Sequence, residues 1–184
     1  MMFNKHFRLL SGFALALSLI FSQLSFAAPS ITAMADGLDF SFRAVDGRDV
    51  SAESLRGDVV VLAFGASWLP LSRTQVQGVQ QLADEYAGRK LQVYWVSTDS
   101  ESPKSRNYAT DDQLRSFARK NGLKVTMLRD PEGEVFKRLG VDGNQLPAVV
   151  ILDRQGNVSG EPIGGLDPEG NLVRQLKERL SALL

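Results

Sequence analysis

The apolar run DVVVLAF, residues 58 to 64, constrains the fold of this chain more than any other feature. Its β-branched residues favour a strand, and the lack of polar alternation indicates that both faces of this strand are covered. Pro70 then suits the first turn of a helix, and apolar residues recur at helical spacing until Gly88. A doubly covered strand that leads into an amphipathic helix predicts an α/β domain.

The rest of the chain supplies further strands and helices without an internal repeat or a linker, so its 184 residues predict one domain. Asp46-Gly47 favours a tight hairpin turn, and Thr110 with Gln113 has the spacing of a capping box. The predicted elements are a hairpin over 39–51, a helical turn over 51–55, strands over 91–97 and 125–130, helices over 111–121 and 134–140, strands over 147–153 and 157–164, and a terminal helix from Asp167.

The N-terminal segment has the pattern of a secretory signal. Lys5, His6 and Arg8 precede the apolar run LLSGFALALSLIF, and small residues at Ser25 and Ala27 close the segment. We expect cleavage after Ala27, a short tail over 28–37, a domain over 38–184 and a periplasmic or otherwise exported location. The alternative is an uncleaved anchor, for which the apolar run is short, since a membrane-spanning helix needs about 20 residues.

Composition excludes several kinds of chemistry. The chain has no cysteine, and His6 is its only histidine, so a chain cleaved after Ala27 has neither residue. Thiolate catalysis, a Ser-His-Asp triad and metal sites built on His or Cys are then impossible. The acidic stretch from Asp130 to Glu134 and Asp153 lack the spacing of a calcium loop, and the stretch predicts a turn and a helix cap. We therefore expect no metal and no cofactor.

Charge also limits the class of partner. The formal net charge is zero, without a long run of one sign, so a surface that tracks nucleic-acid phosphates is not indicated. Loss of Lys5 and Arg8 with the signal leaves two more acidic than basic residues. The expected partner is a protein or an extended peptide in the cell envelope, with no nucleic acid and no membrane after signal cleavage.

Three stretches, with the order of elements, resemble the thioredoxin-like superfamily, in its branch of exported TlpA-like thiol-disulfide oxidoreductases or redoxins. They are VVVLAFGASWLPLSR, GNQLPAVVILDRQGNV and IGGLDPEG, and the resemblance covers residues 38 to 184. It implies a central mixed β-sheet flanked by helices, with an N-terminal β-hairpin. It also implies that Pro147 is the family's cis-proline and faces the loop that contains Trp68.

The departures from this family fall on the reactive positions. Trp68, Pro70 and Arg73 match the family's Trp-Cys-Pro-Pro-Cys-Arg turn, whereas Leu69, Leu71 and Ser72 do not. Leu69 replaces the cysteine whose thiolate a helix N-terminus stabilises, and Ser72 replaces the second cysteine. A leucine cannot ionise and a serine cannot form a disulfide, so the sequence predicts a site without redox activity.

Two classes of function remain open, because a fold alone does not choose between them. The first is a binding module that uses an exposed apolar ridge beside the cis-proline. Its candidate residues are Trp68, Leu69, Pro70, Leu71, Arg73 and Pro147. The second is a thiol-disulfide oxidoreductase or antioxidant redoxin that uses an external thiol or partner. A third possibility is a structural relic, that is, a domain whose fold serves only as a stable part of the cell envelope.

Trp68, Arg73 and Ser72 also have purely structural interpretations. Trp68 packs over the loop, Arg73 is a solvated side chain, and Ser72 is a hydroxyl on the helix surface or in the first helical turn. Leu69 cannot cap the helix that follows it, so water, Ser67 or a partner's carbonyl must meet the first N–H groups.

Overall fold

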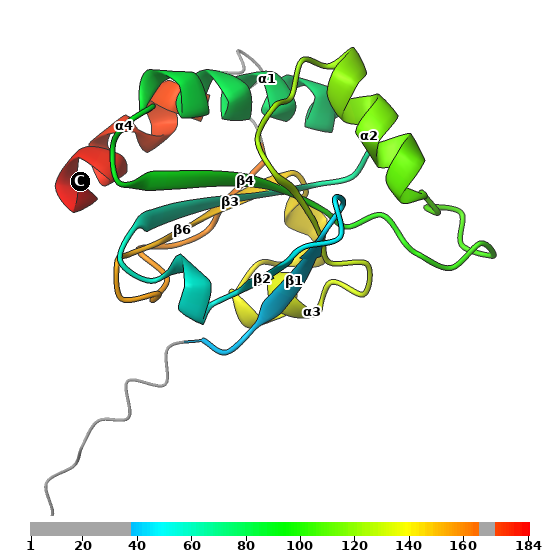
Figure 1. The fold of residues 1–184 in the computed structure, drawn as a ribbon, viewed down its shortest axis with the longest axis horizontal. Helices are drawn as coiled ribbons and strands as arrows, with labels where there is room; N and C mark the ends of the chain where they lie inside the picture. Colours follow the sequence, from blue (N-terminus) through cyan, green and yellow to red (C-terminus); the bar gives the residue numbers. More distant parts are fainter. Residues whose placement is uncertain (1–37, 166–171) are drawn as a thin grey trace, which may run out of the picture. The chain divides into compact units, whose positions relative to one another are not determined.

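The computed structural model describes residues 38–165 and 172–184. The expected signal segment, the tail over 28–37 and the predicted cap of the terminal helix at Asp167 lie outside these residues. A central β-sheet with helices on both faces accounts for most of the described chain (Figure 1).

The sheet has seven strands in the order β2-β1-β5-β4-β3-β6-β7. Strands β3, β4 and β5 are parallel, whereas the remaining neighbours pair antiparallel, so the sheet is mixed, as expected. The bounds are β1 Ser41–Ala44, β2 Asp49–Ser51, β3 Val59–Gly65, β4 Leu91–Ser97, β5 Met127–Arg129, β6 Ala148–Leu152 and β7 Ile163–Gly164. Every residue of β3 is buried, which agrees with its uninterrupted apolar sequence.

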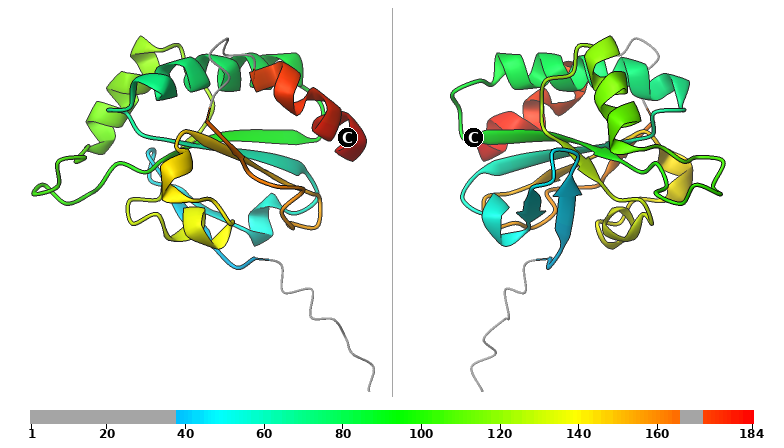
Figure 2. Two further views of the ribbon diagram at one scale, coloured as in Figure 1. Left: turned by 180° about the vertical axis from the view of Figure 1, so that it is seen from behind. Right: turned by 45° about the vertical axis from the view of Figure 1, so that its right-hand side comes forward.

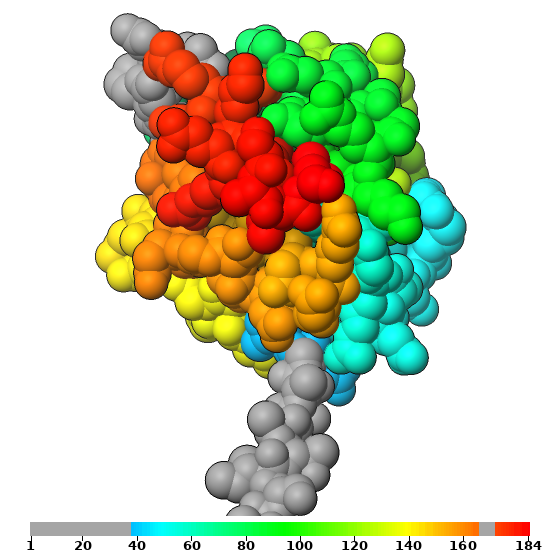
Figure 3. Space-filling view, turned by 90° about the vertical axis from the view of Figure 1, so that its left-hand side faces the viewer, coloured from blue at the N-terminus to red at the C-terminus, as the bar shows by residue number. Residues whose placement is uncertain are grey.

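Three helices cover one face of the sheet and one short helix lies on the other, as Figures 1 and 2 show. The first group is α1 Pro70–Glu85, α2 Asp111–Lys120 and α4 Leu172–Leu183, and the short helix is α3 Glu134–Arg138. Two 3₁₀ turns, η1 Glu53–Leu55 and η2 Gly143–Gln145, complete the helical elements of the described chain. In Figure 3, α4 (red) lies on the surface between the chain around the α1–β4 connection (green) and the β6–β7 segment (orange).

Each face of the sheet has its own hydrophobic core. Under α1, α2 and α4, Trp95 is fully buried and stacks on Phe117 at 5.3 Å between ring centroids. On the α3 side, Phe64 meets Phe136 edge to face at 5.2 Å. An aromatic pair of this kind adds about 0.5–1.5 kcal/mol beyond its buried area. Alternate residues of β3 belong to the two cores, Val61 to the first and Leu62 to the second, so this strand is packed from both sides.

Local sequence signals correspond closely to the structure. The Asp46-Gly47 turn joins β1 to β2, and Thr110 forms the expected reciprocal capping box with Gln113. The Asp130 carboxylate accepts hydrogen bonds from the first N–H groups of α3, at 3.3 and 2.8 Å, so this aspartate is a helix cap.

One predicted strand is much shorter than expected. The sequence suggested a strand over 157–164, but β7 contains only Ile163 and Gly164, and Val158 makes an isolated bridge to Leu152. Gly160 has a φ of 72°, a left-handed conformation that breaks a strand, and Pro162 offers no N–H for a ladder.

Candidate functional site

The loop between β3 and α1 carries an exposed apolar ridge. Trp68 and Leu71 are 53% and 46% exposed, Pro70 is exposed and Leu69 is half-buried. Leu69 is the N-cap residue of α1, Pro70 occupies the first helical position, and no side chain caps this helix. We call residues 68–71 the ridge. It lies at the carboxyl end of β3, because only a short connection separates β3 from α1.

Ser72 faces the interior and holds this loop. Its side chain is fully buried, and its Oγ accepts a hydrogen bond from the Ala66 N–H at 3.0 Å. A position on the helix surface, one of the interpretations of the sequence, is therefore wrong, because the hydroxyl occupies the narrow space between α1 and the end of β3. The buried hydroxyl is an acceptor for the backbone of its own loop.

Gln75 joins three strands to α1, a role that the sequence analysis missed. Its Nε2 donates to the carbonyl oxygens of Phe64 and Ala148, both at 3.1 Å, and its Oε1 accepts from the Trp95 indole at 3.0 Å. Gln75 precedes Val79 by four residues, so helical spacing already placed it on the buried face. A buried amide whose two N–H groups and oxygen are all bonded stabilises one arrangement of these elements.

Gly65 makes room for this arrangement. A Cβ atom at position 65 would lie 2.8 Å from both Gln75 Oε1 and Ser72 Oγ, and 3.0 Å from the Trp95 ring. No side chain fits there unless its neighbours move, so the end of β3 requires glycine.

A buried carboxylate, Asp99, anchors the loop from the other side. Asp99 is 1% exposed and accepts from the Ser67 N–H at 2.8 Å and from the Ser67 hydroxyl at 2.7 Å. It also accepts from the Ser97 hydroxyl at 2.7 Å. Ser67 does not cap α1, because in the described chain no backbone N–H of this helix donates to its hydroxyl, which instead donates to Asp99. No local sequence pattern points to Asp99, since 32 residues separate it from the serine that it binds.

Pro147 lies beside the end of β3, and its peptide bond with Leu146 is cis. Pro147 is buried, and the next residue, Ala148, pairs with Phe64. Within residues 38–165 and 172–184, the backbone N–H and C=O of Leu146 have no hydrogen-bond partner. Trp68 and Leu146 line one shallow groove of about 230 Å³, together with Phe136 and residues of the α3 region. We call it the Trp68 groove.

Arg73, the remaining candidate, faces a different hollow. It lines a groove of about 560 Å³ between α1 and α2. The lining residues of this α1–α2 groove are Ser67, Arg73, Gln113, Ser116, Phe117, Lys120 and Asn121. The structure thus groups Trp68 with Leu146, next to Pro147, and separates Arg73 from them.

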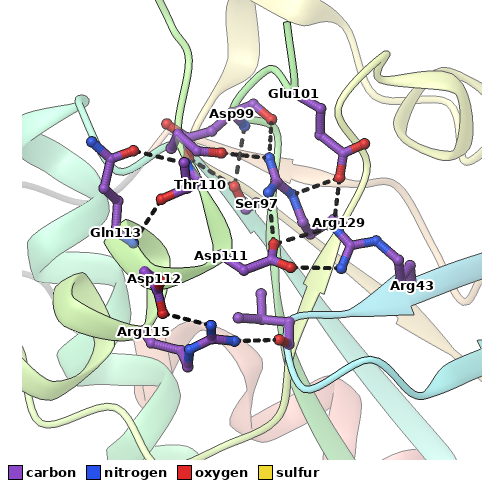
Figure 4. Close-up of polar contacts among 12 residues, drawn as sticks. Arg43, Ser97, Asp99, Glu101, Thr110, Asp111, Asp112, Gln113, Arg115 and Arg129 are labelled. Atoms are coloured by element: carbon purple, nitrogen blue, oxygen red, sulfur yellow. Dashed lines mark hydrogen bonds and ion pairs between the residues drawn. The ribbon is translucent and has the colours of Figure 1, made fainter. Parts of the chain in front are cut away.

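A charged cluster lies behind the loop, around the start of α2 (Figure 4). Arg129 is nearly buried and donates to Asp111 at 2.8 Å and to the carbonyl oxygens of Asp99 and Ala109 at 3.2 and 2.9 Å. Arg43 donates to both Asp111 oxygens, at 2.7 and 3.1 Å. These guanidinium groups, that of Arg43 above all, lower the pKa of Asp111 from 3.8 to about 2 against the opposing effect of its burial.

The same hydrogen bonds, with one to Glu101, raise the pKa of Arg43 above its ordinary value. The cluster joins β1, β5 and α2, so it stabilises the segment that carries Asp99. Each carboxylate and guanidinium in it has a partner, which makes it a structural network.

Neither a metal centre nor a membrane span is found in the described chain. No group of three or more His, Cys, Asp or Glu side chains could hold a metal ion there. Among the same residues, no helix is long and apolar enough to cross a membrane.

Comparisons with known proteins agree with this architecture. The family model described as "AhpC/TSA family" matches residues 33–160. Thioredoxin-like protein YneN of Bacillus subtilis is 27% identical over 128 residues, which cover 68% of each chain. Thiol-disulfide oxidoreductase ResA of Bacillus thuringiensis is 23% identical over 134 residues, which cover 73% of this chain and 70% of ResA.

A solved structure shows the same fold. The structure of MTB dsbF, in mixed oxidized and reduced forms, matches with a TM-score of 0.63 and 28% identity. The match covers 80% of this chain and 97% of dsbF. The expected thioredoxin-like fold and the resemblance to redoxins are therefore confirmed.

Proposed function

Because this chain belongs to the AhpC/TSA family and contains no cysteine, we propose that it is a redox-inactive thioredoxin-like protein. In this proposal it binds an extended segment of a partner protein in the cell envelope. The comparisons support the redoxin family, and the residues at the site support binding without thiol chemistry.

The ridge and its surroundings carry the proposal. Trp68, Leu71 and Tyr108 are the exposed large hydrophobic residues of the described chain, and two of them flank the half-buried Leu69. Exposed aromatic and aliphatic side chains at a groove are typical of docking surfaces. The dedicated thiol positions, in contrast, hold a leucine and a buried serine whose oxygen accepts from the backbone.

Backbone groups beside the ridge suit an extended partner. The N–H and C=O of Leu146 have no partner within the described residues, and Leu146 lines the Trp68 groove. An extended peptide binds such groups through main-chain hydrogen bonds, and side-chain pockets then supply specificity. A segment that pairs with Leu146 would place its side chains near Trp68.

A defined unfolded client tests this function. We expect fluorescence anisotropy to show that reduced, alkylated lysozyme binds to the chain without residues 1–27. Trp68→Ala should weaken this binding about tenfold, because the partner would bury the Trp68 ring in the complex and the variant lacks that aromatic anchor. Leu69→Asp should weaken it similarly, because a charge would replace half-buried apolar surface. Tyr108→Ala is the matched control, since Tyr108 is exposed but does not line the Trp68 groove. If both ridge variants bind as tightly as the parent, the ridge is not the binding site.

The second candidate is a thiol-disulfide oxidoreductase that uses an external thiol, which the family membership favours. An insulin-reduction assay with dithiothreitol separates the two, because a redox-inactive protein leaves the rate at that of the reductant alone. Turnover above that rate that scales with the amount of protein would overturn the redox-inactive proposal.

Export is part of the same proposal. The basic start, the apolar run and the small residues around Ala27 support a cleaved signal. Terminal sequencing of the protein from the envelope fraction should find Ala28 first. An intact Met1 in that fraction would favour a retained anchor.

A further inference from the structure

The α1–α2 groove combines two positive charges with no negative one. Arg73 comes from the first turns of α1 and Lys120 from the last turn of α2, and both side chains are exposed. None of the residues that line this groove is an aspartate or a glutamate. In the Trp68 groove, by comparison, Lys137 lies with Glu132.

The two cations have no counter-ion in the described chain. Arg43, Arg48, Arg115 and Arg129 all form ion pairs, whereas no ion pair or hydrogen bond engages the side chain of Arg73 or Lys120 within residues 38–165 and 172–184. Other exposed cations of the described chain, such as Lys90 and Lys124, also form no ion pair, so Arg73 and Lys120 are distinguished by lining one groove that contains no carboxylate.

Neutral donors complete the lining of this groove. The Gln113 amide nitrogen and the Ser116 hydroxyl make no hydrogen bond within the described residues. Phe117 forms part of the wall and is held by its stacking on Trp95. A groove with cations on both sides, neutral donors and an apolar wall suits carboxylates carried on an aliphatic chain.

The α1–α2 groove also adjoins the ridge. Ser67, which lines it, directly precedes Trp68, and Arg73 follows Leu71 by two residues on α1. A chain bound along the ridge would therefore reach Arg73 within a few residues, since an extended residue spans about 3.3 Å.

We propose that the α1–α2 groove binds acidic side chains of the partner segment, so that the partner carries Asp or Glu beside the apolar residues that contact the ridge. This inference rests on the proposed function and adds the charge of the partner. The groove is recessed between two helices, which favours a peptide over a flat anionic membrane surface.

Two peptides separate this inference from the proposed function. Amide NMR shifts of the chain without residues 1–27 are followed during titration with hexaglutamate and, separately, with a neutral peptide rich in leucine and valine. Hexaglutamate should shift the amides of residues 73 and 113–121, and the neutral peptide those of Trp68, Leu69, Leu71 and Leu146. Binding of hexaglutamate should weaken as salt rises, because exposed charges are screened.

Charge reversal identifies the residues responsible. Arg73→Glu and Lys120→Glu should each weaken hexaglutamate binding about fivefold, because attraction at an exposed site becomes repulsion of similar size. Lys124→Glu is the matched control, since Lys124 is an exposed cation just beyond α2 that lines a different groove. Unchanged thermal melts of the three variants would show that each is folded.

Several outcomes overturn the inference. They are the absence of shifts at residues 113–121, equal weakening by Lys124→Glu, and binding to phosphatidylglycerol vesicles that needs Arg73 while hexaglutamate does not bind. If the neutral peptide still shifts the amide signal of Trp68 in these cases, the proposed function stands, and only the inference that the partner is acidic is wrong. If hexaglutamate binds through Arg73 but no neutral peptide reaches the ridge, the groove is an acidic-peptide site and the ridge proposal fails.

Discussion

Replacement of Asp99 by asparagine tests whether a buried carboxylate holds the ridge loop in place. Asp99 accepts three hydrogen bonds of 2.7–2.8 Å, two from Ser67 and one from Ser97. Asparagine keeps the shape but loses the charge, and it turns an amide N–H₂ group toward a group that is itself a donor.

The size of the effect follows from those contacts. A hydrogen bond to a charged group contributes about 1.5–3 kcal/mol, and a buried donor left without an acceptor costs about 1–3 kcal/mol. One carboxylate oxygen accepts from both the Ser67 N–H and the Ser97 hydroxyl, and the other accepts from the Ser67 hydroxyl. An asparagine oxygen at the first position keeps these two bonds with a neutral, weaker acceptor, and its N–H₂ group then faces the Ser67 hydroxyl. Since such contributions are not additive, we expect Asp99→Asn to lower the free energy of unfolding by about 2–4 kcal/mol.

Urea unfolding followed by far-UV circular dichroism gives this free energy, and amide hydrogen exchange locates the change. Ser67→Ala is the matched control: it removes one hydroxyl but leaves the Ser67 N–H bonded to Asp99, so about 1 kcal/mol is expected. In Asp99→Asn the Ser67 amide should exchange faster than the change in global stability explains. A loss below about 0.5 kcal/mol, or an unchanged Ser67 amide, would refute the anchoring role.

Two further predictions concern the charged cluster and the lost thiol pair. The pKa of Asp111 is about 2 in the folded chain against 3.8 ordinarily, so its ionised form stabilises the fold above pH 3.8, and this contribution is lost as the pH falls toward 2. After allowance for solvent screening, Asp111→Asn should cost about 1–2 kcal/mol at pH 7 and less near pH 2.5 in urea unfolding, and an equal cost at both values would contradict the ion-pair explanation. Leu69→Cys with Ser72→Cys should fold, form a disulfide and gain reductase activity in the insulin assay, because the two positions are one helical turn apart at a thioredoxin-like helix start. Ellman titration after oxidation checks the bond, and two free thiols in a folded variant would show that the loop lacks the geometry of a disulfide site.

The sequence alone predicted the elements of this fold and the loss of thiol chemistry. Some features depend only on residues close together in the chain, so a sequence pattern can predict them without a structure. They are the β3 strand, the proline at the start of α1 and the Thr110 capping box. The absence of cysteine is a property of composition, and no arrangement in space changes it. The motif around Leu69 and Ser72 pointed to the correct family because its remaining matches, Trp68, Pro70 and Arg73, also lie close together in the chain.

Tertiary structure alone decided what surrounds the loop. Asp99 reaches Ser67 across 32 positions, and Gln75 reaches Ala148 across 73. Arg73 was predicted beside the ridge, but its side chain lines the groove with Lys120, which no local pattern links to it. Such pairings depend on how β3, β4 and α2 pack, because a buried polar group takes whichever partner the folded chain brings within hydrogen-bonding distance.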